Sequence, residues 1–126
     1  MRVLAVLGFS FGLITLSVPA NAKRDTSVPI ATPSGKEVSC ISLTSIRESR
    51  VRSDSVIDFK TNGNKWYRNT LPNSCPSLGF EERFSYKTSL NQLCSVDIIT
   101  VLQSPGLSQG ASCGLGPFQP VELVKR

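Results

Sequence analysis

From about residue 40 onwards, hydrophobic residues recur in short runs that are separated by Gly, Pro, Asn and Ser. Val, Ile, Thr, Phe and Tyr are common in these runs, and no segment keeps apolar residues at helical spacing for three turns. This pattern is typical of β-strands rather than helices. It predicts a mostly β fold, with a small antiparallel sheet or partly closed barrel of about five to six short strands and at most one short helix.

The clearest local signal is a hairpin in the stretch TNGNKWYRN. Asn62 and Gly63 tolerate the positive φ of a tight turn, so residues 56–60 and 65–69 are predicted to pair.

Loop length decides which residues of this hairpin face one another. A two-residue loop places Phe59 opposite Trp66. A three-residue loop pairs Phe59 with Tyr67 and Asp58 with Arg68. We prefer the three-residue loop because it matches charges as well as aromatic rings.

Other elements follow from shorter patterns. Residues 40–47 alternate as in a half-buried strand, and residues 84–88 present one aromatic face. Residues 95–102 are apolar on both faces, so we expect a fully buried strand there. Residues 113–123 contain prolines, which lack the N–H that a central strand donates, and predict an edge strand. Residues 78–83 are compatible with a short helical turn.

The first 22 residues have the features of a secretory signal peptide. Arg2 precedes an apolar stretch over 3–18, and small residues end the segment at Ala20-Asn21-Ala22. We expect cleavage after Ala22, with no membrane span afterwards and a periplasmic or extracellular location.

The rest of the chain is expected to form a single domain. Residues 23–39 contain two prolines and no sustained apolar period, which predicts a flexible leader, and the disulfide-stapled β domain is expected over 40–126. The chain has 14 basic and 9 acidic side chains, so removing Arg2 with the signal peptide leaves a net charge of +4. This mild excess suits many anionic surfaces and specifies none.

Four cysteines, Cys40, Cys75, Cys94 and Cys113, indicate two disulfides in an oxidising compartment. The chain has no histidine, which excludes Cys-His and Ser-His-Asp catalysis. The cysteine spacing matches no metal-binding motif, so we expect no metal and no cofactor. We predict the pairs Cys75–Cys94, which ties an irregular loop to the start of the most apolar strand, and Cys40–Cys113, which joins the first strand to the last.

Several short motifs together resemble a known family. They are Cys40-Ile41, YRNTL, CPSL, FSYKTS, LCSVD and CGLGPF, and the resemblance that they carry covers residues 40 to about 121. In these motifs the chain is similar to small secreted proteobacterial proteins catalogued as the domain of unknown function 6491 family. The resemblance implies a cell-envelope location and a small β fold, and it carries no activity with it.

Individual acids and amides have structural interpretations. Asp97 follows a cysteine closely and is expected to cap a turn by accepting backbone N–H groups. Asn69 is expected to hydrogen-bond the adjoining loop backbone. Asp54 and Asp58 match no calcium-binding loop, and we expect both at the surface.

The stretch RESRVRSD contains the only local basic cluster, formed by Arg47, Arg50 and Arg52. We expect this stretch to be a charged turn or an irregular edge. Arginines protect a sheet edge from aggregation, and in an extended chain Arg50 and Arg52 share a face that suits phosphate or carboxylate. Trp66 or its neighbour Tyr67 is expected to be an exposed contact, because the two point to opposite faces.

Two function classes compete. The first is a non-catalytic secreted envelope protein that binds a partner protein or an anionic polymer through the arginine cluster and an exposed aromatic. The alternative is a small hydrolase or lyase that cleaves envelope polysaccharide without histidine, which requires two carboxylates in one cleft. We favour the first, since few catalytic options remain without histidine. Nucleic acid is not expected as a partner, because the charge excess is small and no basic stripe alternates with aromatics.

Overall fold

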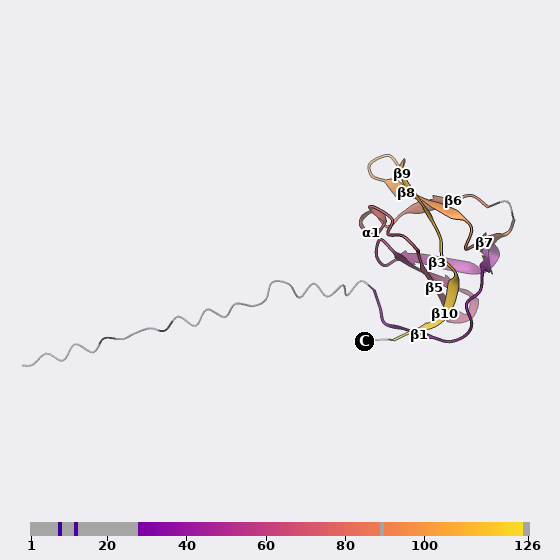
Figure 1. Ribbon diagram of the computed structural model, residues 1–126, viewed down its shortest axis with the longest axis horizontal. Coiled ribbons are helices and arrows are strands. Elements are labelled where there is room, and N and C mark those ends of the chain that lie inside the picture. Colours follow the sequence, from indigo (N-terminus) through magenta and orange to yellow (C-terminus); the bar gives the residue numbers. More distant parts are fainter. Residues whose placement is uncertain (1–7, 9–11, 13–27, 89, 125–126) are drawn as a thin grey trace, which may run out of the picture.

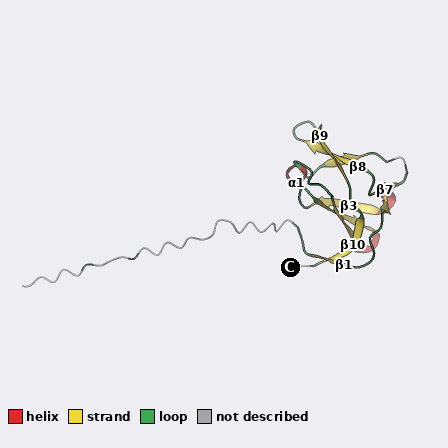
Figure 2. Ribbon diagram, viewed as in Figure 1, coloured by secondary structure: helices red, strands yellow, loops and turns green. Residues whose placement is uncertain are grey.

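The computed structural model describes residues 8, 12, 28–88 and 90–124. The predicted cleavage point after Ala22 lies outside these residues. The described chain is mostly strand, with one short α-helix (Figures 1 and 2). The elements are β1 (Ala31–Pro33), β2 (Cys40–Ser42), η1 (Leu43–Ser45), β3 (Ile46–Val51), β4 (Val56–Thr61), η2 (Asn62–Asn64), β5 (Lys65–Thr70), α1 (Leu78–Glu81), β6 (Phe84–Tyr86), β7 (Gln92–Cys94), β8 (Ile98–Gln103), β9 (Ser108–Gly114) and β10 (Phe118–Leu123).

The strands form three antiparallel sheets. The largest has the order β1-β10-β5-β4-β3, a second has the order β6-β8-β9, and β2 pairs with β7 alone. In Figure 1 the three-stranded sheet lies above the five-stranded sheet, with β7 at the side. The predicted mostly β fold is confirmed, and it takes the form of antiparallel sheets without a closed barrel.

The predicted hairpin is confirmed in its preferred register. β4 and β5 are joined by the three-residue turn η2, Asp58 lies opposite Arg68, and Phe59 lies opposite Tyr67. The last two turn residues have positive φ, which glycine and asparagine adopt most readily.

The core lies between the two larger sheets. Phe59 of β4 is fully buried and packs edge-on against Phe118 of β10 and Phe84 of β6, with ring centroids 5.6 and 6.3 Å apart. Ile57 of β4 and Ile99 of β8 are also fully buried. Each such side chain contributes about 1.5–3 kcal/mol through burial. The hairpin and the later strands therefore stabilise one another.

Ordered structure begins earlier than predicted. β1 pairs with β10, and Val38 bridges to Phe118, so the chain joins the large sheet well before Cys40.

β10 is not an edge strand, because β1 and β5 flank it. Pro120 is accommodated because its carbonyl accepts the Ser34 N–H at 2.9 Å. The N and O atoms of one strand residue point to the same side, so the missing N–H faces the short leader strand and leaves the ladder to β5 intact.

Two other predicted strands differ from the structure. The segment predicted as one strand over 40–47 is broken by η1, so β2 joins β7 while β3 joins β4. The stretch predicted as a charged turn or an irregular edge is largely the edge strand β3, whose register with β4 shifts between Ile46 and Glu48. Pairing with β4 outweighs the low β propensity of its charged residues.

The segment 95–102 is buried on one face only. Ile99 and Val101 are fully buried, whereas Ile98 is 57% exposed. The antiparallel sheet β6-β8-β9 packs one face on the core and leaves the other open, which an apolar run does not reveal.

The predicted disulfide pairing is wrong. Cys40 bonds Cys94, and Cys75 bonds Cys113. Cys94 is the last residue of β7, where it lies directly opposite Cys40 on β2, rather than the head of the long apolar strand. The loop that carries Cys75 is tied instead to β9. The cysteine pairing follows from the pairing of β2 with β7, which no local sequence pattern predicts.

Candidate functional site

Among the residues that the structure describes, no strand pairs with the outer side of β3, which is therefore the open edge of the five-stranded sheet. The Arg52 N–H donates to the Val56 carbonyl at 2.8 Å, so Arg52 and Val56 form a hydrogen-bonded pair of the β3–β4 ladder. Hydrogen-bonded and non-hydrogen-bonded pairs alternate along an antiparallel ladder. Ser49 and Val51 therefore direct their backbone N–H and C=O groups away from β4, towards the open edge.

A groove runs along this edge. It has two adjoining parts of about 310 and 460 Å³, which share Ser49 and Glu82. We call it the β3 groove. Its lining residues are Ser49, Arg50, Val51, Arg52, Glu82, Arg83, Phe84, Tyr86, Leu102 and Leu107. Arginines concentrate on the β3 side, and apolar side chains line the other part.

The opposite wall of the groove also presents an open strand edge. Within the described part of the chain β6 pairs with β8 alone, and the Leu102 N–H donates to the Arg83 carbonyl at 3.0 Å. By the same alternation, Phe84 and Tyr86 turn their backbone polar groups away from β8. β3 and β6 thus border the groove with outward-directed backbone groups.

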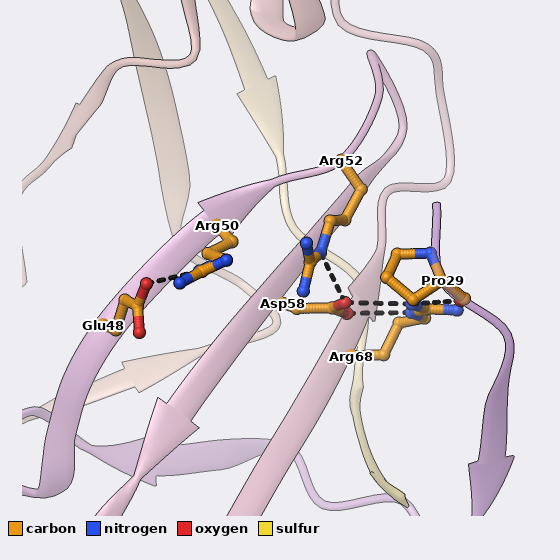
Figure 3. A network of polar contacts seen from close by, with 6 residues as sticks. All are labelled: Pro29, Glu48, Arg50, Arg52, Asp58 and Arg68. Atoms are coloured by element: carbon orange, nitrogen blue, oxygen red, sulfur yellow. Dashed lines mark hydrogen bonds and ion pairs between the residues drawn. The ribbon is translucent and has the colours of Figure 1, made fainter. Parts of the chain in front are cut away.

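Beside the groove, Asp58 of β4 is buried beneath two arginines. Arg68 of β5 binds both carboxylate oxygens, with Nε to Oδ1 at 2.8 Å and Nη2 to Oδ2 at 2.9 Å. Arg52 binds Oδ2 through Nε at 3.0 Å. Figure 3 shows the two guanidinium groups meeting at this carboxylate. Asp58 is fully buried, so the predicted surface position is wrong.

The two arginines that bind Asp58 also contact Trp66 and the segment before β1. The Arg52 guanidinium lies over the Trp66 ring, 5.8 Å from its centroid, and Arg68 Nη2 also donates to the Pro29 carbonyl at 2.9 Å. One carboxylate thus binds two arginines. Its contacts hold Arg52 in place at the end of the groove.

The structure brings together part of the predicted arginine cluster. Arg50 and Arg52 line the β3 groove, and Arg50 also pairs with Glu48 on the same exposed face. Arg47 is outside the groove lining and donates through Nε to Asn62 at 2.6 Å.

Sequence reasoning missed other residues of this region. Arg83 and Glu82 follow α1 and reach the groove only because β6 lies across from β3. Arg68 had a usable signal, since the hairpin register already placed it opposite Asp58.

Of the polar residues with structural interpretations, Asp97 caps a turn as predicted, whereas Asn69 bonds Gly116, a residue of a distant loop, instead of the adjoining loop. The Asp97 carboxylate accepts the Cys94 N–H at 2.7 Å and so caps the turn after β7. Asn69 is fully buried, where it accepts the Gly116 N–H at 2.8 Å and donates to the Gly116 carbonyl at 2.6 Å. Half-buried Asp54 accepts the Gly79 N–H at 2.7 Å.

Carboxylates are dispersed around the molecule. A second groove of about 440 Å³ on the three-stranded sheet contains Asp97 and Lys87, and the β3 groove contains Glu82. Each of these grooves has one carboxylate in its lining. Within the described residues, no three His, Cys, Asp or Glu side chains gather closely enough to hold a metal ion.

No helix in the same part of the chain has the length and hydropathy to cross a membrane.

Comparison of the chain with protein-family models, with curated proteins and with solved structures finds no match. The site is therefore interpreted from its own geometry.

Proposed function

We propose that the mature chain is a non-catalytic envelope protein that binds an anionic partner in the β3 groove. The observation that carries this proposal is the position of Arg50 and Arg52 along an open strand edge, with Arg83 across from them. Guanidinium groups donate in a fixed fork that fits carboxylate and phosphate oxygens.

The side chains that line the groove favour an anion. The lining contains three arginines and one acid, Glu82. Arg52 shares its carboxylate partner with Arg68, and the Arg50–Glu48 pair is exposed, with side-chain exposures of 54% and 37%. Exposed pairs contribute about 0–1 kcal/mol, so an incoming carboxylate can compete for Arg50.

A location outside the cytoplasm accords with this role. Both disulfides join distant parts of the chain, and such bonds persist in oxidising compartments. Together with the predicted signal peptide, they support residence in the periplasm or export. The resemblance to the domain of unknown function 6491 family agrees with an envelope location.

Binding has more support than cleavage of a polysaccharide. Glycoside hydrolysis generally needs two carboxyl groups about 5–10 Å apart around the scissile bond. Each groove described above offers one, and the Asp97 carboxylate already holds a backbone N–H.

Trp66 offers a direct assay. It is the only tryptophan, and Arg52 connects it to the groove. Its fluorescence should change saturably when the mature chain is titrated with poly-L-glutamate or with dextran sulfate. Affinity should fall with added salt, because exposed charges are screened.

The matched variants are Arg50→Gln with Arg83→Gln, and Arg47→Gln as a control outside the groove. The double variant should bind at least about tenfold more weakly, which corresponds to 1.4 kcal/mol, and the control should bind within about twofold. Equal loss in both variants, or no binding of either polyanion, would overturn the proposal.

A further inference from the structure

We infer that the groove takes an acidic, extended peptide, which adds to β3 as a sixth strand of the large sheet. The inference rests on the proposed function and specifies its partner. Strand addition requires an open edge, room beside it, and side chains that fit alternate positions of the guest. The β3 groove meets all three conditions.

The backbone supplies the first condition. Ser49 and Val51 direct their N–H and C=O groups into the groove, and both residues line it. An antiparallel guest strand exchanges two hydrogen bonds with each of them. β3 offers a longer template than β6, with six residues against three.

The side chains specify an alternating guest. Arg50 lies on the outer face beside Asp58, whereas Ser49 lies opposite Phe59 on the core-facing side. Guest side chains on the outer face therefore meet Arg50 and Arg52, and those on the inner face meet Phe84 and the apolar end of the groove. Because strand residues alternate between faces, the preferred guest alternates acidic and apolar residues.

Charge argues against the other occupants. A second copy of β3 brings arginines to an edge already rich in arginines, and like charges across a strand pair are destabilising. Basic pairs also flank the described domain in the sequence, Lys23-Arg24 before it and Lys125-Arg126 after it. An acidic partner is the complementary choice.

The test uses the disulfide-bonded mature chain and a capped peptide of alternating Glu and Val. Amide hydrogen exchange followed by NMR should slow at Ser49 and Val51 when the peptide binds, while the Phe84 and Tyr86 amides keep their rates. A Lys-Val peptide of the same length is the charge control and should not bind.

Ser49→Pro removes one outward N–H and leaves the β3–β4 ladder intact, because that N–H faces away from β4. It should weaken peptide binding about five- to tenfold, whereas Ser49→Ala should bind within about twofold of the parent chain. Circular dichroism and the thermal midpoint show whether the proline variant is folded. If the proline variant is unfolded, slowed exchange at Ser49 and Val51 of the parent chain tests strand addition instead.

Several outcomes would overturn strand addition while leaving anion binding intact. They are polyanion binding without slowed exchange at Ser49 and Val51, protection at Phe84 and Tyr86 instead, binding of dextran sulfate but not of the peptide, and peptide-independent dimerisation through β3 in analytical ultracentrifugation. Failure of every anionic probe would remove the proposed function as well.

Discussion

Replacing Asp58 by asparagine should be among the most destabilising isosteric changes in this protein. The carboxylate is fully buried and receives three hydrogen bonds from two arginines. Asparagine keeps the shape and removes the charge, so the two guanidinium groups lose the buried carboxylate that they share.

The magnitude follows from the geometry. In its better orientation, the asparagine oxygen accepts from Arg68 Nη2 and Arg52 Nε, and its NH₂ group then opposes Arg68 Nε. The arginine side chains are only 14% and 15% exposed, so water replaces the lost partner poorly. Breaking a buried ion pair by removing one partner costs about 3–5 kcal/mol. For a domain of this size, Tm should fall by at least about 12 °C.

Urea denaturation of Asp58→Asn and the parent chain measures this cost. Glu48→Gln is the matched control, since it removes a carboxylate from the exposed pair with Arg50 on the same face, and it should change the free energy of unfolding by less than about 1 kcal/mol. The difference should persist at about 1 M salt, where exposed pairs are screened. A cost below about 1 kcal/mol for Asp58→Asn would refute the reasoning.

The remaining predictions concern the covalent and packed framework. Non-reducing peptide mapping should return a Cys40–Cys94 peptide, and replacing that pair by serine should cost about 4 kcal/mol in the chain-entropy model, given its 54-residue separation; free thiols or another pairing would contradict the structure. Asn69→Ala should cost about 3 kcal/mol in urea denaturation, because it leaves a buried N–H and C=O unpaired, and a change under about 1 kcal/mol would show that they find other partners. Gly116→Ala should lower Tm by several degrees, since its Cβ would lie 2.2 Å from the Thr70 carbonyl oxygen; an unchanged Tm would mean that the backbone moves easily.

Local features of the fold were predictable because neighbouring residues determine them. The β4–β5 turn needs positive φ at its end, and its flanking charges and rings match in only one of the two registers considered. The Asp97 cap likewise depends on residues a few positions apart.

Features that join distant segments escaped prediction. Pro120 sits inside the large sheet because the leader supplies β1, a short strand with little apolar signal. The disulfides follow from the pairing of β2 with β7. In the β3 groove, Arg50 and Arg52 were found from their spacing. Arg83 was missed because it lies between α1 and β6 and reaches the groove from the side opposite β3.

The most direct test of the β3 groove as the binding surface is backbone-amide chemical-shift mapping of the isotope-labelled mature chain during titration with poly-L-glutamate. Saturable shifts should gather at 49–52 and 82–86, with the Trp66 indole signal moving at the same ligand concentration. Shifts confined to other surfaces, or their persistence at full strength after Arg50→Gln with Arg83→Gln, would contradict binding in the groove.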